Sequence, residues 1–244
     1  MPPPRLFSTA ALRPNSDLEL GAEPARYVGR VLRLRRGDEL IVFDGNGGEY
    51  AATLCNVSKQ ALNLTVGHFI DRDTESPLNI RLVQGVSKGE KMDVVVQKAT
   101  ELGVARISPV LTDFSVVKLD AGRAEKRREH WQKVAQSACE QCRRNIVPII
   151  DAPQPMLTWF GDNAASKNVQ LILHADADVP MREIEMNGNE LTLLIGPEGG
   201  FSDAEYERAA AAGLLAARLG PRVMRTETAA IAAISAAQTT WGDY

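Results

Sequence analysis

Two glycine-bearing segments near the end of the sequence decide the fold, because each closes a short apolar run with a turn. Residues 193–202 read LLIGPEGGFS and residues 219–229 read LGPRVMRTETA. Apolar runs that end at glycine predict strands that run into loops at the carboxyl edge of a sheet. Open α/β folds bind their ligands at that edge. Neither segment has the Gly-Lys-Ser/Thr or G-x-G-x-x-G spacing of the common phosphate loops, which disfavours ATP and NAD as ligands.

The same alternation extends back to residue 78, where short apolar runs begin to alternate with segments of helical periodicity. This alternation predicts a mainly parallel sheet with helices on both faces. The expected strands are 80–83, 107–110, 147–150, 169–173, 191–195 and 214–219. One expected helix, 92–102, ends at Gly103, and another starts with a capping box at Ser202 and ends near Gly213. Thr226 or Thr228 is expected to cap the final, alanine-rich helix.

The first 71 residues predict a separate β-rich domain. Strands are expected at 31–34, 39–43, 49–54 and 61–66, and the Asp-Gly and Asn-Gly steps within 44–48 predict a hairpin. The polar residues 72–77 are expected to form a linker to a second domain at 78–244.

Composition restricts the class of protein. The chain has 244 residues, of which 44% are hydrophobic and 24% are charged, as in an ordinary globular protein. Because the sequence has no apolar stretch of membrane-spanning length and no secretory signal at its start, we expect the protein to be located in the cytoplasm. Cys139-x-x-Cys142 invites a redox or zinc interpretation, but helix packing is favoured since no second Cys/His pair is nearby, and no metal is expected.

The net charge of −3 is unevenly distributed, with +4 in the first 144 residues and −7 in the remainder. Five arginines lie without an acid between Arg26 and Arg36, and a second basic group runs from Lys118 to Arg144. Two interpretations stay open from charge alone. These residues are either ordinary solvated surface or two patches that face the phosphates of a nucleic acid.

Several segments, in this order along the chain, resemble the RsmE family of SPOUT-class methyltransferases. These segments are VLR at 31–33 with Gly37-Asp38, KGEKM at 88–92, QKATELGV at 97–104, ACEQCRR at 138–144 with Val147-Pro148, and the two C-terminal loops. Two positions depart from the family pattern: Tyr27 stands where histidine is frequent, and Met224 replaces leucine.

The resemblance implies S-adenosylmethionine-dependent methylation of N3 of a uridine in small-subunit (16S) ribosomal RNA. It also implies a PUA-like β-barrel followed by a SPOUT domain with a C-terminal trefoil knot near 190–240. The methyl donor would bind inside the knot. A homodimer would share the RNA site, with the last helix as an interface element, and the partner would be ribosomal RNA or the 30S subunit. Two rival functions stay open: a non-catalytic RNA-binding or ribosome assembly protein, and an ordinary nucleotide-binding enzyme.

Site residues follow from the resemblance and from the chemistry of each side chain. The arginines of the second loop suit charge that develops on uracil oxygens, while Glu198 could bind ligand, act as a base or cap its own loop. His174 is either a ligand contact or a packed strand-end residue. The expected catalytic residues are Arg225, Arg222 and Glu198. The expected cofactor residues are Leu173, His174, Leu194, Ile195, Gly196, Pro197, Glu198, Gly199, Gly200, Leu219, Gly220, Val223, Met224, Arg225, Thr226 and Thr228. The expected RNA contacts are Arg5, Arg26, Arg30, Arg33, Arg35, Arg36, Lys88, Lys91, Arg143 and Arg144.

Overall fold

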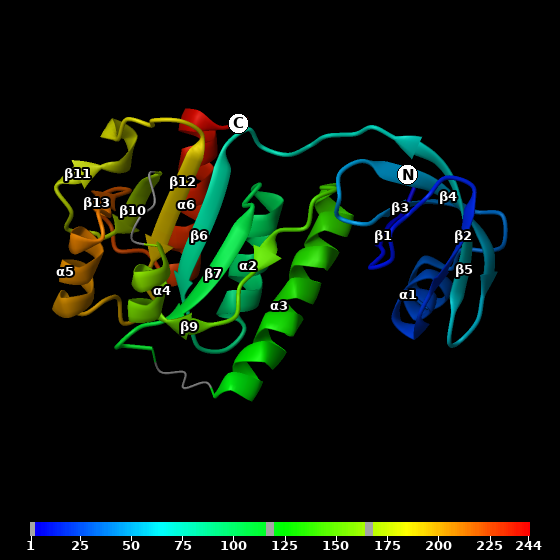
Figure 1. The fold of residues 1–244 in the computed structure, drawn as a ribbon, viewed down its shortest axis with the longest axis horizontal. Coiled ribbons are helices and arrows are strands. Elements are labelled where there is room, and N and C mark those ends of the chain that lie inside the picture. The colour runs from blue at the N-terminus through cyan, green and yellow to red at the C-terminus, as the bar shows by residue number, and fades with distance from the viewer. Residues whose placement is uncertain (1–2, 116–119, 164–167) are drawn as a thin grey trace. The chain divides into compact units, whose positions relative to one another are not determined.

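A computed structural model describes residues 3–115, 120–163 and 168–244, which divide into two units (Figure 1). The first unit comprises the chain up to Glu75 together with 139–147, and the second comprises 76–138 and 148–244. The sequence did not predict that 139–147 belongs with the first unit. Hydrogen bonds account for it, since the Phe7 N–H donates to the Glu140 carboxylate at 2.9 Å and the Asn145 amide donates to the Arg72 carbonyl at 3.0 Å.

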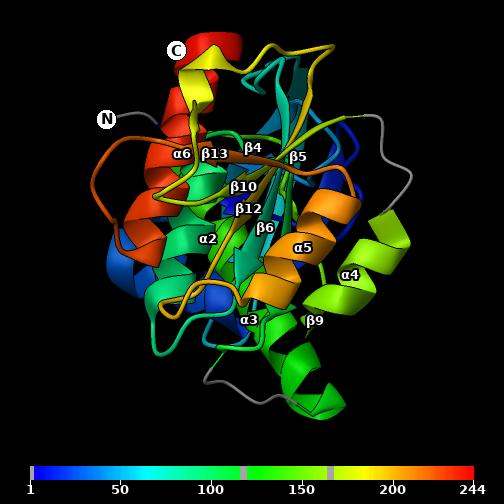
Figure 2. The same ribbon diagram turned by 90° about the vertical axis from the view of Figure 1, so that its left-hand side faces the viewer.

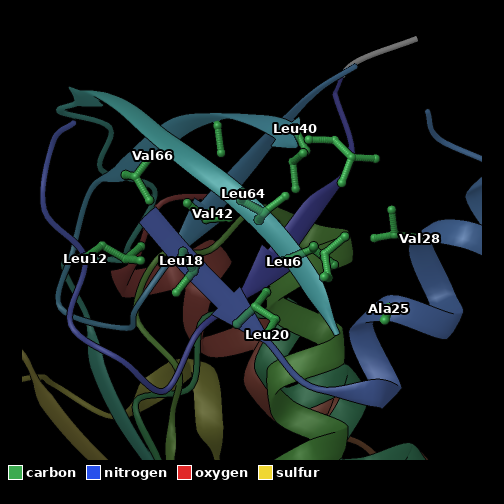
Figure 3. Packing of buried hydrophobic residues seen from close by; sticks show 13 residues of the cluster. Leu6, Leu12, Leu18, Leu20, Ala25, Val28, Leu40, Val42, Leu64 and Val66 are labelled. Carbon is green, nitrogen blue, oxygen red and sulfur yellow. The ribbon is translucent and has the colours of Figure 1, made fainter. Parts of the chain in front are cut away.

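A curled five-stranded sheet forms the core of the first unit. Its order is β1-β3-β4-β5-β2, with β1 parallel to β3 and the other pairs antiparallel. The strands are β1 (Arg5–Phe7), β2 (Ser16–Leu20), β3 (Glu39–Phe43), β4 (Glu49–Val57) and β5 (Leu62–Ile70). The alternate inward residues of β3 and β5, including Val42, Leu64 and Val66, meet Leu6 and Leu18 in one buried cluster (Figure 3). The predicted strands at 39–43, 49–54 and 61–66 and the hairpin turn between β3 and β4 are confirmed.

The predicted strand at 31–34 is wrong, because the chain is helical through α1 (Ala22–Arg26) and η1 (Tyr27–Leu32). Ala25 and Val28 are buried three residues apart and Leu32 packs against the same cluster, which is the spacing of a helix face. Val31, by contrast, is 65% exposed. The apolar run that resembled a strand therefore belongs to two different faces of a helix.

The second unit contains the predicted parallel sheet, with eight strands where six were expected. Seven strands follow the order β11-β13-β10-β12-β6-β7-β8, and β9 also pairs with β7. The strands are β6 (Asn79–Gly85), β7 (Arg106–Leu111), β8 (Ile149–Ile150), β9 (Gln154–Pro155), β10 (Val169–Leu173), β11 (Val179–Pro180), β12 (Glu190–Ile195) and β13 (Leu215–Arg218). Only the last two residues of the run expected at 147–150 are in a strand.

Helices cover both faces of this sheet (Figure 2). On one face, α2 (Lys91–Glu101) packs beside α6 (Thr226–Trp241), and α3 (Ala121–Cys142) is bound to α2 through the Trp131 indole, which donates to Asp93 at 3.1 Å. On the other face, α4 (Met156–Asn163) and α5 (Asp203–Ala211) cover a buried cluster that includes Trp159, Ile172 and Leu194. The short helix η2 (Met181–Glu183) follows β11.

The helix ends agree with the sequence in two places and differ in one. Ser202 and Glu205 form the predicted capping box of α5, and Gly103 follows α2 with a φ of +84°. The prediction that Thr226 or Thr228 caps α6 is wrong, because Arg225 holds the N-cap position and no side chain caps it. The Thr226 hydroxyl instead donates to the Gly196 carbonyl at 2.6 Å.

Two further observations concern the described part of the chain. Cys139 is buried in α3, and a hydrogen bond with Cys142 together with burial raises the pKa of its thiol. Within the described residues, no helix is both long and apolar enough to cross a bilayer, and no group of three His, Cys, Asp or Glu side chains could hold a metal.

Candidate functional site

The carboxyl ends of β10, β12 and β13 open into a cavity of about 660 Å³ within the second unit. The loop that follows β12, residues 196–200, and the loop that follows β13, residues 219–225, both contribute to its wall. We call them the first loop and the second loop. Because parallel strands end at one edge, two loops that are distant in sequence meet there. The volume is in the range of about 300–1,000 Å³ that is typical of small-molecule sites.

Most of the predicted cofactor residues line this cavity. They are Leu173, His174, Ile195, Gly196, Pro197, Glu198, Gly199, Gly200, Leu219, Gly220, Val223, Met224, Arg225 and Thr226, and Arg222 lies among them. Two predicted residues lie elsewhere: Leu194 is buried in the cluster beneath α4 and α5, and Thr228 is exposed on α6. Sequence reasoning missed Ala175, Asp176, Phe201, Tyr206, Ala217 and Ala229, and it assigned Lys91 to RNA alone. Ala229 could have been found, since it lies one helical turn after Thr226.

The first loop is fixed by close packing and by one chain of hydrogen bonds. A Cβ on Gly85 would lie 2.4 Å from Pro197 Cδ, so only glycine lets β6 approach the loop this closely. The buried Gln84 amide donates to the Thr226 hydroxyl at 2.9 Å, and that hydroxyl donates to the Gly196 carbonyl. The first turn of α6 is thereby bonded to the first loop.

An ion pair closes the rim of the first loop. Lys91 Nζ lies 2.7 Å from Glu198 Oε1, and both side chains are partly exposed. Although burial acts to raise the pKa of Glu198, hydrogen bonds from Lys91 and from the backbone of Lys88 hold the pKa below its ordinary value. Glu198 is therefore an ionised and partnered carboxylate at neutral pH, which makes it a weak proton acceptor.

Three aromatic rings form one wall of the cavity. The Tyr206 ring packs edge-on against His174, with centroids 4.8 Å apart, and against Phe201 at 5.5 Å. Burial, with help from the charges of Glu205 and Asp176, raises the pKa of Tyr206 to about 12, so its hydroxyl stays neutral. The Nδ1 atom of His174 accepts from the Asp176 N–H at 3.2 Å, and this bond orients the ring.

The second loop is open to solvent. Arg222 and Arg225 are exposed, Val223 is 86% exposed, and a Cβ on Gly220 would meet no atom within 4 Å. Neither arginine has an ion-pair partner among the residues that the structure describes. The backbone is held at both ends of the loop: Arg218, just before it, donates to the carbonyls of Ala177 and Asp178, and the Arg225 carbonyl accepts from the Ala229 N–H at 2.8 Å. Two cations thus stand free at the mouth of the cavity.

The predicted RNA contacts fall into three groups. The arginines at 26, 30, 33, 35 and 36 are all exposed on or just after α1 and η1, as are Lys88 and Arg143 elsewhere. Lys91 belongs to the rim of the cavity. Arg5 and Arg144 form the third group and are described next. Lys118, where the second basic group of the sequence begins, lies outside the described residues.

Arg5 and Arg144 require a correction, because both are buried in ion pairs. The Arg5 guanidinium contacts the Glu49 carboxylate and donates to Asn145 Oδ1 at 2.6 Å, and Arg144 is bonded to Glu75. These guanidinium groups hold the first unit together and are not available to phosphate. Sequence alone could not separate them from the exposed arginines, since their partners lie 44 and 69 residues away.

Comparison with family models gives two matches. A model described as an RNA methyltransferase domain matches residues 74–238, and one described as an RNA methyltransferase PUA domain matches residues 20–67. Together they cover both units of the chain, including all of the cavity residues.

Similar proteins are found both among curated sequences and among solved structures. A protein of Buchnera aphidicola from Acyrthosiphon pisum, named ribosomal RNA small subunit methyltransferase E, is 34% identical over 99% of this chain and 95% of its own length. The protein of that name from Bacillus subtilis is 33% identical over 88% of this chain and 86% of its own.

Two solved structures have the same fold as this chain. A methyltransferase from Legionella pneumophila, solved with bound cofactor SAM, has a TM-score of 0.93 and 38% identity over the whole of both chains. A ribosomal RNA small subunit methyltransferase E from Neisseria gonorrhoeae, bound to S-adenosyl methionine, has a TM-score of 0.91 and 36% identity over 99% of each chain.

Proposed function

This chain belongs to the RNA methyltransferase family whose members are named ribosomal RNA small subunit methyltransferase E, and we propose that it methylates 16S ribosomal RNA with S-adenosylmethionine as the donor. The observation that carries the proposal is the single cavity formed by the two loops. Similar structures hold that cofactor.

The residues of the cavity fit this cofactor. Leu173, Leu219 and Met224 offer apolar surface, and the side-chain positions of Gly200 and Gly220 are empty of protein atoms. The exposed carboxylate of Asp176 suits hydroxyl or ammonium donors of the cofactor. A mostly apolar pocket with a few polar groups is the usual form of a cofactor site.

We assign the acceptor as N3 of a uridine, and the free arginines of the second loop support this choice. When bound, S-adenosylmethionine supplies an electrophilic methyl group on a sulfonium sulfur. The proton on N3 must leave as nitrogen attacks, and negative charge then spreads onto the uracil carbonyl oxygens. Arg225 and Arg222 line the cavity, carry permanent charge and have free donors, so they can stabilise that charge. Glu198 is assigned to holding the first loop through Lys91.

The arrangement after β13 supports a trefoil knot near 190–240. Strand β13 lies outside β10 in the sheet, yet α6 returns to pack against β12, β6 and α2, and Thr226 bonds to the first loop. We assign this knot to the catalytic domain at 78–244. The preceding domain, expected at 1–71 with a linker at 72–77, is assigned to RNA binding as a PUA-like barrel, and the first unit extends it to Glu75 and by residues 139–147.

We further propose a cytoplasmic homodimer in which the alanine-rich helix α6 contributes to the interface. Ala229, Ala232 and Ala236 are partly exposed along α6, and small side chains permit close approach of a second helix. Light scattering of the purified protein tests this assignment, since a molar mass of one chain contradicts it.

RNA binding is assigned to the exposed arginines of the first unit. Replacing Arg33, Arg35 and Arg36 with alanine should weaken binding to 30S subunits and reduce the dependence of the dissociation constant on salt. The physical reason is that each phosphate contact releases a counterion and adds about 0.7–0.9 to the slope of log K against log salt. An unchanged slope would show that the patch does not touch phosphate.

Methyl transfer to 30S subunits from cells that lack this protein tests the function directly. Nucleoside analysis of the product RNA should reveal N3-methyluridine that is absent before the reaction. Gly220→Val is the matched control, because Gly220 lines the cavity and a Cβ there would meet no protein atom within 4 Å. Cofactor binding without any methyl transfer to subunits or to their RNA would favour a non-catalytic RNA-binding protein, and tight binding of ATP or NAD would favour a nucleotide-binding enzyme.

A further inference from the structure

An exposed phenylalanine lies beside the first loop, outside the cavity. Phe114 follows β7 in the turn 112–115 and is 51% exposed. Phe114 is not part of the cavity wall. Its Cβ and carbonyl oxygen pack directly against Gly199, and Gly199 does line the cavity. A Cβ added to Gly199 would lie only 2.8 Å from Phe114 Cβ. The Phe114 ring therefore lies next to the cavity but does not line it.

The backbone that carries this ring is firmly held. The Ser115 N–H donates to the Thr112 carbonyl at 3.0 Å, and the Thr112 N–H donates to the Ser115 hydroxyl at 3.0 Å. The turn is also bonded to the start of α5, since the Asp113 N–H donates to Glu205 at 3.0 Å and the Ser202 hydroxyl donates to Asp113 at 2.6 Å. Glu205 is itself buried. An exposed apolar side chain on so fixed a turn is preorganised for a partner.

The surroundings of Phe114 indicate the chemistry of that partner. The residue before Gly199 is Glu198, whose carboxylate lies 2.7 Å from Lys91 Nζ, so one lysine ammonium belongs to the same rim, beside that carboxylate and near the carboxylate of Asp113. Within the described residues, the Phe114 ring has no aromatic or cationic stacking partner. An aromatic face with a cation nearby is the combination that single-stranded nucleic acids bind, through base stacking and phosphate contacts.

We propose that Phe114 stacks on a nucleobase that flanks the methyl acceptor in the RNA strand. The inference rests on the function proposed above and adds a contact residue to it. A flanking base is specified because Phe114 adjoins Gly199 but does not line the cavity. Stacking on Phe114 would hold the RNA strand in place. The acceptor uridine would leave the base stack of that strand and enter the cavity.

Three substitutions of Phe114 test the proposal with unmethylated 30S subunits as the probe. Phe114→Ala removes the ring but keeps the Cβ and carbonyl that pack on Gly199, so the first loop is left in place. We expect the KM for subunits to rise about 5- to 100-fold, the range that follows from the loss of one stacked base. The affinity for S-adenosylmethionine should stay within about twofold, because the ring does not line the cavity. Phe114→Trp should keep the wild-type KM, and Phe114→Leu should resemble the alanine variant, since leucine retains apolar volume but has no π face.

Leu157→Ala serves as the matched control, because Leu157 is similarly exposed, at 56%, on α4 and outside the cavity. A wild-type KM for Phe114→Ala would overturn the proposal, as would a leucine variant as good as the native protein. An equal loss of cofactor affinity in Phe114→Ala would show that the ring merely supports the first loop. If the native protein transfers no methyl group to subunits, the proposed function fails first and is distinguishable from these outcomes.

Discussion

The two loops of the cavity differ in how they are held. The first loop is packed against Gly85, bonded through Thr226 to Gln84, and closed by the Lys91–Glu198 ion pair. The second loop is anchored at its two ends, by Arg218 and by the Arg225 carbonyl that begins α6, and between them it exposes the side chains of Arg222, Val223 and Arg225 to solvent. The first loop therefore acts as a preformed wall, whereas the second presents free groups to whatever enters the cavity.

This difference separates stability from activity. Substitutions that disturb the first loop should lower the free energy of unfolding, because its contacts are already made in the folded protein. Substitutions in the second loop should leave folding intact and lower binding or turnover, since its side chains contact little of the chain.

Arg225→Ala should have the largest effect, on turnover. Removing one donor that stabilises developing negative charge typically lowers kcat about 10²- to 10³-fold, or about 3–4 kcal/mol. The Arg225 side chain makes no cap hydrogen bond to α6, so the free energy of unfolding should change by less than about 0.5 kcal/mol. Single-turnover methyl transfer and urea unfolding measure the two quantities. Equal losses in kcat and in cofactor affinity would contradict a role specific to the transition state.

Gly85→Ala should destabilise the protein by about 1–3 kcal/mol, because the new methyl group would overlap Pro197 and displace the first loop. Gly220→Ala is the matched control in the second loop. Its methyl group would meet no protein atom, so stability should be unchanged while S-adenosylmethionine binds more weakly. Urea unfolding and calorimetric titration of the cofactor provide the comparison. A stable Gly85→Ala variant would show that the first loop tolerates movement.

Thr226→Val should cost about 1–2 kcal/mol of stability. The substitution nearly preserves shape but removes a hydroxyl that donates to Gly196 and accepts from Gln84, which leaves the buried Gln84 amide and the partly buried Gly196 carbonyl with fewer partners. Thr228→Val is the control, since Thr228 is exposed on the same helix and should change stability by less than about 0.5 kcal/mol. A similar loss for both variants would point to helix propensity instead of the bond between α6 and the first loop.

The outline of the site could be predicted from sequence because periodicity fixes which ends of the strands share an edge. Runs at 191–195 and 214–219 gave two parallel strands, and their loops had to meet. The wall residues Asp176 and Tyr206 could not be predicted in this way. Asp176 lies in an irregular segment after β10, and Tyr206 faces the cavity only because α5 packs over β10 and β12.

Long-range partners account for the other differences. Glu140 belongs with the first unit because it accepts from the distant Phe7 N–H, and no local pattern around residue 140 contains that information. In the same way, Arg5 is buried and Arg33 is exposed although both are arginines, and the residue type alone does not predict which of them is buried. The sequence does not reveal the helix at 22–32, because the four residues 31–34, three of them apolar, are too few to separate a period of 2 from one of 3.6.

Glu198→Gln should have the smallest effect, and one that depends on pH. Lys91 and backbone donors hold the pKa of Glu198 below its usual value of 4.5, so the ion pair adds stability above that pH and loses it as pH falls through the lowered pKa. Because both side chains are partly exposed, the difference between native and variant at pH 7 should be at most about 0.5–1 kcal/mol and should shrink below pH 4.5. Urea unfolding at pH 7 and pH 4 measures this change. The kcat of the variant between pH 6 and 9 should stay close to that of the native protein, because a carboxylate that is already ionised and partnered is a poor base. A loss of a hundredfold with intact stability would instead make Glu198 the proton acceptor and would place the chemistry on the first loop as well as the second.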